Sequence, residues 1–301
     1  MSIYYHHGDT VEFSQTVVAL GTFDGLHRAH MKIIKAAERY AVKAGLKWGV
    51  MLFDIIPANA VGARKAGLLM TNDEKKEILS GADFFYTESF DSDFYGKSPE
   101  EFINYLKCTL HASAVSVGYN YRFGNNAAGD VRLLEELCKN AGIKVLVTEK
   151  TELDGQVVSS TVIRELVAEG RVDEASEFLG RNFFITGDVE SGLQNGRKMG
   201  IPTANIHAEG RLLPKSGVYS GYCTFDGIRR KAIINVGSNP TFGGSSVTIE
   251  GHILDFDGDI YGKGIKAEFV RRLRDEQKFK SSEELAARIK KDIEQCRKEL
   301  K

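Results

Sequence analysis

Short apolar runs alternate with longer segments of three- and four-residue apolar periodicity from Val17 to about Gly180. This alternation is typical of βαβ units, in which a buried strand is followed by an amphipathic helix. It predicts an α/β fold with a Rossmann-like, doubly wound parallel sheet, whose site lies at the carboxyl ends of the strands. The expected strands are 17–20, 48–53, 84–86, 114–117 and 145–147, and the expected helices are 31–44, 72–80, 99–110 and 131–141.

Past Arg181 the helical periodicity gives way to short β-rich runs separated by Gly, Asn and Asp. Asp226-Gly227 and Asp257-Gly258 are dipeptides of the kind that forms tight hairpin turns. This second region is therefore expected to form a small antiparallel β-barrel. Its expected strands are 183–189, 217–225, 230–236, 247–255 and 265–269.

The C-terminal segment 281–300 predicts a terminal helix. Ser281 and Glu284 have the spacing of a capping box. One apolar stripe follows along the helix, formed by Leu285, Ile289, Ile293, Cys296 and Leu300. With 301 residues and about 150 residues per domain as a guide, we expect two domains, 1–181 and 182–301.

The composition is that of an ordinary globular protein, with 42% hydrophobic and 27% charged residues. The net charge is −1, so no overall field would hold the chain on nucleic acid or on an anionic membrane. The expected partners are therefore small molecules, without nucleic acid or membrane. The sequence leaves the oligomeric state open and is compatible with a homo-oligomer.

The four cysteines, Cys108, Cys138, Cys223 and Cys296, are scattered without CxxC spacing. Each has an apolar or helical context in which a free thiol packs as a small hydrophobe. This indicates a reducing compartment and no zinc site. The first 16 residues lack a basic segment followed by an apolar run, and no run of about 18 apolar residues occurs. We therefore expect a cytoplasmic protein.

The most specific motif of the first region is GTFDGLHRAH, residues 21–30, which follows an apolar strand and opens a helix. Backbone N–H groups at a helix start favour an anion, and Gly21 and Gly25 permit close approach of a phosphate. His27 and His30, three apart, are expected on one helical face, where they would stabilise charge during attack on an α-phosphate. The alternatives are a solvated histidine pair or two ligands of a metal.

Two further segments fit nucleotide binding. In VGYNYRFG, residues 117–124, the amide of Asn120 suits nucleotide recognition, or else satisfies loop backbone groups. In SSTVIR, residues 159–164, Ser160 and Thr161 are placed to cap a helix, while Arg164 offers a fixed cation for a triphosphate. A plain helix cap is the alternative reading of that segment.

In the second region, Thr203 and Asn205 of the PTAN string, residues 202–205, each present an oxygen suited to Mg²⁺. The loop before them, residues 192–198, includes Gly196 and Lys198 and is expected to fold over phosphates. Taken alone, PTAN is more typical of a turn in which Thr and Asn bond the backbone.

The 21–30 motif resembles the GxFDGxHxGH block of HIGH-type nucleotidyltransferases, in the version carried by bacterial bifunctional riboflavin kinase/FMN adenylyltransferases. The 117–124 and 159–164 segments look like motifs of the same superfamily. The resemblance implies that Gly21, Phe23, Asp24 and Gly25 bind nucleotide. This chain has Ala29 where the family usually has glycine, and FDIIP from Phe53 where the family shows a variant of FxPHP.

The second region is similar to the riboflavin kinases of this family over nearly all of 182–301. Five segments carry the resemblance, in order 217–219, 235–243, 250–255, 259–262 and 273–279. It implies that Thr203 and Asn205 hold Mg²⁺–ATP and that Glu250 accepts a proton from the riboflavin 5′-hydroxyl. It also assigns Arg274 and Glu276 to flavin binding. Without the resemblance, Glu250 would read as a surface glutamate and 274–278 as a solvated charge run.

Three hypotheses follow. The first is a bifunctional enzyme that phosphorylates riboflavin to FMN and adenylylates FMN to FAD, with ATP as co-substrate, Mg²⁺ as cofactor and pyrophosphate as product. The second is a riboflavin kinase whose first domain is weak or inactive, motivated by Ala29 and Ile55-Ile56. The third is a noncatalytic flavin-binding regulator, against which an intact Glu250, Thr203 and Asn205 count.

Overall fold

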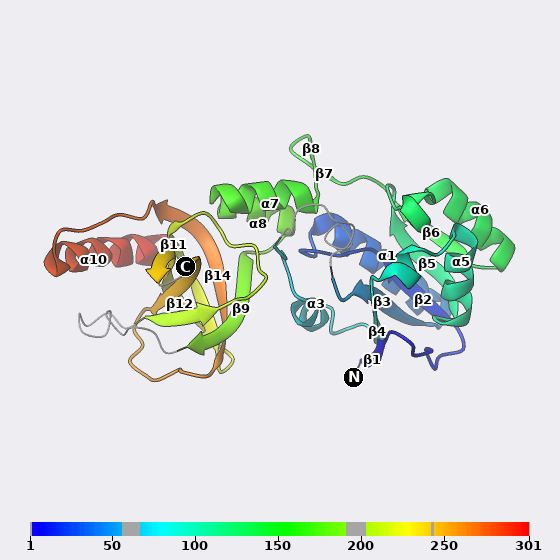
Figure 1. Cartoon of the computed structure of the whole chain (residues 1–301), viewed down its shortest axis with the longest axis horizontal. Coiled ribbons are helices and arrows are strands. Elements are labelled where there is room, and N and C mark those ends of the chain that lie inside the picture. The colour runs from blue at the N-terminus through cyan, green and yellow to red at the C-terminus, as the bar shows by residue number, and fades with distance from the viewer. Residues whose placement is uncertain (1, 56–66, 191–202, 242–243, 301) are drawn as a thin grey trace. The chain divides into compact units, whose positions relative to one another are not determined.

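The computed structural model describes residues 2–55, 67–190, 203–241 and 244–300. The chain divides into two compact units, Met1–Ser160 and Thr161–Lys301, each treated by itself below (Figure 1). No helix within these described ranges is long and apolar enough to cross a membrane.

The first unit is built on a six-stranded parallel sheet, which confirms the predicted fold class. Its strand order is β1-β4-β3-β2-β5-β6. The strand bounds are β1 Ile3–His6, β2 Thr16–Leu20, β3 Lys47–Phe53, β4 Phe84–Glu88, β5 Ala112–Gly118 and β6 Lys144–Thr148. The sequence pattern missed β1, because this edge strand has one buried position, Tyr5, and so lacks an apolar run.

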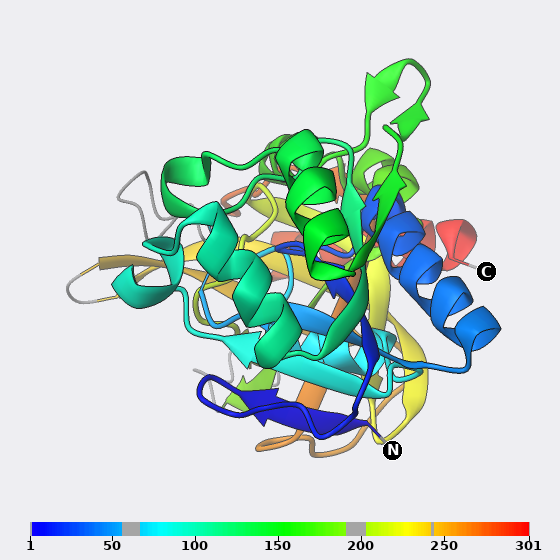
Figure 2. The same cartoon turned by 90° about the vertical axis from the view of Figure 1, so that its right-hand side faces the viewer.

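Helices cover both faces of this sheet. Helix α1 (Arg28–Ala44) lies on one face, and helices α5 (Pro99–Cys108) and α6 (Val131–Ala141) lie on the other (Figures 1 and 2). Each helix has a defined end: α1 closes on Gly45 in the left-handed conformation, and α5 opens with a Ser98–Glu101 capping box. The shorter elements are α3 Asn72–Ile78, α4 Ser92–Tyr95, η1 Asn125–Ala127, β7 Glu152–Leu153 and β8 Gln156–Val157.

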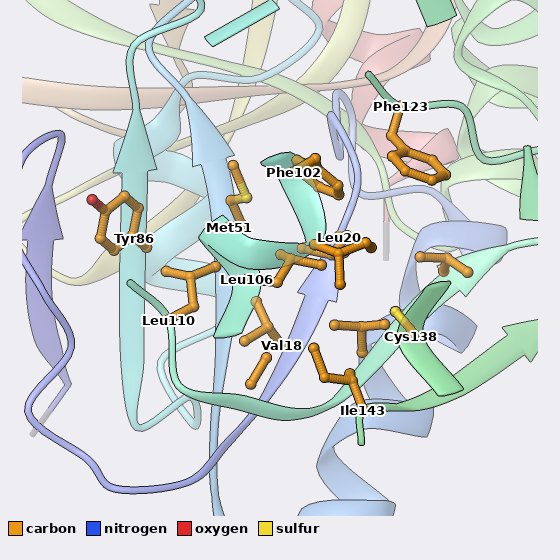
Figure 3. Packing of buried hydrophobic residues seen from close by; sticks show 14 of the residues in the cluster. Val18, Leu20, Met51, Tyr86, Phe102, Leu106, Leu110, Phe123, Cys138 and Ile143 are labelled. Carbon is orange, nitrogen blue, oxygen red and sulfur yellow. The ribbon is translucent and has the colours of Figure 1, made fainter. Parts of the chain in front are cut away.

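The core of the first unit fills the space between the sheet and helices α5 and α6 (Figure 3). Val18 and Leu20 of the central strand point into it, and Leu106 of α5, fully buried, packs against them. Every residue of β2 is buried, as expected for a central parallel strand with both faces covered. A ligand therefore has access to this strand only at the loops beyond its ends.

The strand order sets where those loops open. From β2 the chain crosses through α1 to β3 on one side, whereas from β5 it crosses through α6 to β6 on the other. At such a switch point the loops after two adjacent parallel strands diverge and leave a crevice. The crevice lies beyond Leu20 and Gly118, where the 21–30 and 117–124 motifs were predicted to act.

The second unit is a closed antiparallel barrel in the order β10-β13-β12-β11-β14-β9, with β9 pairing to β10, as predicted. Its sequence pattern missed only the four-residue strand β10 among the barrel strands. The bounds are β9 Phe183–Glu190, β10 Ala204–His207, β11 Gly217–Phe225, β12 Ile228–Thr241, β13 Gly244–Ile253 and β14 Gly264–Arg274.

Three helices accompany the barrel: α7 (Ser160–Glu169), α8 (Val172–Leu179) and α10 (Ser282–Glu299). The predicted stripe on α10 is confirmed where Cys296 and Leu300 pack against Val218 and Ile233 on the outside of the barrel. The predicted capping box is half formed. Ser281 accepts from Glu284 N, but the Glu284 carboxylate accepts from Lys280 N.

Of the two predicted hairpin turns, one is confirmed. Asp226 and Gly227 join β11 to β12 with φ of 50° and 72°, the left-handed pair that a type I′ turn requires. Asp257-Gly258 instead lies inside the longer 254–263 loop between β13 and β14, so that prediction was wrong. The four cysteines are free, and Cys108 is exposed rather than packed.

We expect any side chain at Gly49 of β3 to destabilise the first unit, because the Phe84 ring lies over this position. A Cβ added there would stand 2.5 Å from Phe84 Cε2. Gly49→Ala should therefore lower the free energy of unfolding by about 1–3 kcal/mol through overpacking. Urea unfolding followed by the fluorescence of Trp48, the single tryptophan, measures it. Gly81→Ala is the matched control, since nothing lies within 4 Å of its Cβ position. Equal stability of the two variants would contradict the packing argument.

Candidate active sites

A cavity of about 880 Å³ opens at the switch point of the first unit. It is bounded by the loops that follow β2 and β5 and by the start of α1. The structure thus brings together most of the predicted residues of this unit, namely Gly21, Phe23, His27, His30, Asn120 and Ser160. Ala29, the departure from the usual glycine, also lines the cavity.

The two histidines form a stacked pair. Their ring centroids are 3.5 Å apart with an interplanar angle of 17°. His27 is the N-cap of α1 rather than a residue inside the helix, and its Nδ1 accepts from His30 N at 3.3 Å. His27 is buried, and the edge of Phe23 supports the His30 ring. The pair is thereby held at the positive end of α1, beside the first N–H groups of the helix.

The turn before the histidines has an unusual backbone. Phe23 and Leu26 have positive φ, 49° and 40°, with Gly25 at 86° between them. The buried carboxylate of Asp24 accepts from Leu69 N at 3.3 Å and from Met70 N at 3.1 Å. Asp24 therefore anchors the turn to a distant segment, and neither Asp24 nor Gly25 is among the described residues that line the cavity. Their nucleotide contact stays a prediction.

The other predicted residues differ in how they are held. Asn120 lines the cavity and is exposed to solvent. Ser160, the last residue of the first unit, donates from its Oγ to Asp24 O at 2.8 Å, so its side chain is held by the turn. Thr161 is exposed and Arg164 half-buried within α7. The roles of Thr161 and Arg164 at a triphosphate stay predictions.

One wall of the cavity consists of aromatic rings. Phe53 and Phe123 belong to quoted motifs, but Phe90, Phe94 and Phe102 do not, and the motifs did not predict the wall. Phe53 meets Phe90 and Phe94 edge-on, with centroid separations of 5.0 and 5.5 Å. Phe102 and Phe123 continue the wall at 5.3 Å. The available signal was the aromatic spacing in 90–102, which lies outside any motif. A cavity lined both by aromatic rings and by a helix N-terminus suits a ligand that is aromatic at one end and anionic at the other.

In the second unit the predicted base and metal ligand are neighbours across strands. Glu250 of β13 is paired with Asn205 of β10 on one side and with Asn235 of β12 on the other. The flanking Ile249 and Gly251 are buried, so the alternation of the strand turns Glu250 to the outer face of the barrel. Opposite Cβ atoms on paired strands lie about 5 Å apart, which places a carboxylate between two amides.

A second carboxylate lies close to this group. Glu276 reaches over Gly237 of β12, where an added Cβ would collide with Glu276 Oε1 and stand 3.2 Å from Asn235 Nδ2. Burial, and then the charge of Glu276, raise the pKa of Glu250. A carboxylate with a raised pKa is a stronger base than an exposed carboxylate with an ordinary pKa. The raised pKa of Glu250 therefore suits a proton acceptor.

A cavity of about 770 Å³ opens beside this group. Thr203 and His252 line it, together with the 255–261 part of the β13–β14 loop. Among the described residues, Asn205 and Glu250 do not line the cavity itself. Gly196, Lys198 and Pro202 lie outside the described residues.

Arg274 is held by an ion pair instead of standing free. Its Nε and Nη2 donate to the buried Asp292 carboxylate of α10 at 2.9 and 2.8 Å, and Arg288 Nε lies 3.1 Å from the same carboxylate. Arg274 Nη1 donates to Asp275 O at 3.0 Å, at the start of the segment that carries Glu276. The flavin contacts of Arg274 and Glu276 stay predictions.

The fold and the two cavities define a class of protein: a nucleotide-binding α/β unit followed by a barrel with a carboxylate–amide site. Family models agree with this division. The model described as FAD synthetase matches residues 9–162, and the model described as riboflavin kinase matches residues 179–300.

Bacterial relatives match the whole chain. The bifunctional riboflavin kinase/FMN adenylyltransferase of Listeria monocytogenes is 33% identical, covering 98% of this chain and 97% of its own. Its Bacillus subtilis namesake is 32% identical, covering 97% and 94%. The chain belongs to the bifunctional riboflavin kinase/FMN adenylyltransferase family.

One solved structure shares the fold over its full length. It is titled as a macrolide-efflux protein from Streptococcus pneumoniae and matches 98% of this chain and 99% of its own. The TM-score is 0.88 at 28% sequence identity.

We expect Asp292→Ala to destabilise the barrel unit by about 3–5 kcal/mol, because it leaves the guanidinium of Arg274 without its buried partner. Hydrogen exchange of β14 and α10, read by mass spectrometry in native conditions, measures the effect locally. Asp275→Ala is the control, because its side chain is 73% exposed and its ion pair with Arg272 lies at the surface. Unchanged protection of α10 in Asp292→Ala would show that the ion pair does not hold this helix.

Proposed function

We propose that this chain is a bifunctional enzyme of flavin cofactor synthesis. The barrel region, 182–301, transfers the γ-phosphate of ATP to the 5′-hydroxyl of riboflavin and forms FMN. The α/β region, 1–181, transfers AMP from a second ATP to FMN and forms FAD and pyrophosphate. The observation that carries the proposal is that each of the two family matches contains its own candidate site, with the histidine pair in the first and Glu250 in the second.

In the kinase step, the Glu250 carboxylate accepts the proton of the riboflavin 5′-hydroxyl as that oxygen attacks the γ-phosphorus. ADP leaves, and the proton passes from Glu250 to solvent. Little covalent chemistry is asked of the protein, so alignment of alcohol and phosphate is the main contribution. The raised pKa of Glu250 favours proton acceptance, and Asn205 and Asn235 flank it on the paired strands.

Mg²⁺ is the expected cofactor of the kinase. The donor set fits it, since Thr203 and Asn205 offer a hydroxyl and an amide oxygen at the start of β10, and Mg²⁺ prefers few protein oxygens plus ATP phosphates. When bound, the ion neutralises phosphate charge. Thr203 also lines the 770 Å³ cavity, which is the candidate ATP site.

In the adenylyl transfer step, a phosphate oxygen of FMN attacks the α-phosphorus of ATP, and the bond to pyrophosphate breaks. His27 and His30 lie at the positive end of α1, where they donate to the oxygens that gain charge. The aromatic wall of Phe53, Phe94 and Phe102 is suited to the flat flavin ring.

The alternatives are less well supported. A kinase with a weak first domain rests on Ala29, whose methyl group borders the cavity. Ile55, the other described departure, lines a separate small cavity. A noncatalytic flavin regulator would not need Glu250 and the histidine pair. The similar solved structure is called a macrolide-efflux protein, whereas both family models that match this chain describe flavin enzymes.

We also propose a cytoplasmic location and small-molecule partners only. The support is that all four cysteines are free in the structure, as in reducing compartments, and that the net charge is −1. A homo-oligomer is compatible with this assignment.

Two single variants should separate the two activities. Glu250→Gln should lower FMN formation from riboflavin by about 10²–10⁴-fold, because the proton acceptor is lost, and leave FAD formation from FMN unchanged. His30→Ala should lower FAD formation by about 10²–10³-fold and leave the kinase unchanged. Chromatographic assay of each step with ATP and Mg²⁺ measures both. Each variant is the folding control for the other. If either variant lost both activities or neither, the assignment of the sites would be wrong.

Removal of Mg²⁺ gives a further test. With excess chelator, FMN formation should cease, because Thr203 and Asn205 alone do not neutralise the ATP phosphates. Readdition of Mg²⁺ should restore the rate, and Asn205→Ala should raise the Mg²⁺ concentration at half-maximal rate. A rate that is independent of the chelator would contradict the proposed metal role.

A further inference from the structure

Lys75 is a buried lysine that no motif accounts for. It lies in α3 within the charged run NDEKKE, a composition that is typical of a solvent-exposed helix surface. Its side chain is nevertheless buried, with 4% of the residue exposed. Burial of an ammonium is costly unless it is hydrogen-bonded and faced by opposite charge.

The Lys75 ammonium bridges two loops of the first site. Its Nζ donates to Thr22 O at 3.2 Å, in the turn after β2, and to Asn72 Oδ1 at 3.1 Å. The amide of Asn72 in turn donates to Phe53 O at 2.8 Å, at the end of β3. One connected network therefore ties the ends of two adjacent parallel strands to a single helix.

The helix that carries Lys75 is itself fixed at its start. Thr71 and Glu74 form a capping box, with Glu74 N donating to Thr71 Oγ1 at 3.2 Å and Thr71 N to Glu74 Oε2 at 2.8 Å. Asn72 and Lys75, three apart, face the same side of the helix. The ammonium is thus delivered to Thr22 by a rigid element.

The bonded turn is the strained one. Phe23 and Leu26 both hold positive φ, a strained backbone conformation that persists only where the surroundings enforce it. Asp24 anchors the far side of this turn through Leu69 N and Met70 N. Lys75 holds the start of this turn, at Thr22, the residue that precedes Phe23.

The position of Thr22 matters for the large cavity. Thr22 and Phe53 line both the 880 Å³ cavity and a smaller one of about 230 Å³, and Lys75 lines the smaller one only. Lys75 therefore lies behind Thr22 and Phe53, which form part of the wall of the candidate nucleotide site, and does not line that site itself.

We propose that Lys75 is a positioning residue for adenylyl transfer, which holds the Thr22 carbonyl and thereby keeps the 21–26 turn in the conformation that presents the helix start and the histidine pair to ATP. The inference rests on the proposed function of the first unit. Lys75 does not touch the reacting atoms and acts through the backbone of the turn.

The charges around Lys75 make this role dependent on pH. Asp24 faces it from the turn after β2 and Glu74 from its own helix, and Asp54 borders the same small cavity from the loop after β3. Burial lowers the pKa of Lys75 to about 8, and Asp24 and Glu74 oppose that shift only in part. As pH rises through about 8 the ammonium is lost in the folded state, so the turn loses its charged partner and activity falls.

Fold stability should move in the opposite direction. Because the pKa of Lys75 is lower in the folded than in the unfolded chain, the unfolded state binds the extra proton between about pH 8 and the ordinary lysine value of 10.5. The Lys75 contribution to the free energy of unfolding therefore rises with pH over this window, while adenylyl transfer declines. A lysine with only a structural role would not make the free energy of unfolding and the rate of adenylyl transfer change in opposite directions.

The test compares wild type, Lys75→Met, Lys75→Arg and Lys76→Met. Lys76 is the matched control, because it pairs with Asp73 and lies over the Tyr4 ring. In Lys75→Met we expect kcat for FAD formation to fall about 10- to 100-fold, with KM for FMN changed less than about twofold. Lys75→Arg should restore part of kcat and remove the decline above pH 8. Lys76→Met and riboflavin phosphorylation in all four proteins should stay at wild-type values.

The outcomes are distinct. If wild type makes no FAD from FMN, the proposed function of the first unit fails. If wild type makes FAD and Lys75→Met matches it in kcat and pH profile, the role of Lys75 is refuted. Should Lys75→Met unfold the first unit, as Trp48 fluorescence would report, the wild-type and Lys75→Arg pH profiles decide alone. A decline above pH 8 that persists unchanged in Lys75→Arg would overturn the inference.

Discussion

The alternation of side chains along a β-strand is the constraint on which both sites depend. In the sheet, helices cover both faces, so every position of β2 is buried and all but Thr16 are apolar, and the candidate site lies in the loops beyond Leu20 and Gly118. In the barrel, the inner face is filled and helices such as α10 cover only part of the outer face, so polar residues are tolerated at outward positions elsewhere. Glu250 faces outward between the buried Ile249 and Gly251 for this reason.

The two candidate sites are positioned by the fold in different ways. The first is built on a strained turn and a helix start, which hold the N–H groups and the histidine pair in place. The second uses cross-strand neighbours, where strand register alone sets Asn205, Glu250 and Asn235 side by side. Register is a rigid positioning device, because a one-residue slip would turn Glu250 into the barrel interior.

Periodicity in the sequence predicted the parallel sheet, the barrel and the terminal helix, since each has a repeating buried face. It missed β1 and β10, which are four residues long and have too few buried positions to show a period. The motifs predicted that the histidine pair and Asn120 belong to one site, and these residues line the same cavity. They did not reveal that Asp24 anchors the turn, that Arg274 is committed to Asp292, or that Lys75 is buried. Those contacts join segments far apart in the sequence, and local pattern holds no information about them.

The central claim is that one chain carries both steps from riboflavin to FAD. A time course of purified wild-type protein with riboflavin, ATP and Mg²⁺, resolved by chromatography, tests it most directly. We expect FMN to appear first and FAD to follow at the expense of FMN, with pyrophosphate released in equal amount to FAD. Accumulation of FMN without any FAD, or no conversion of riboflavin, would contradict it.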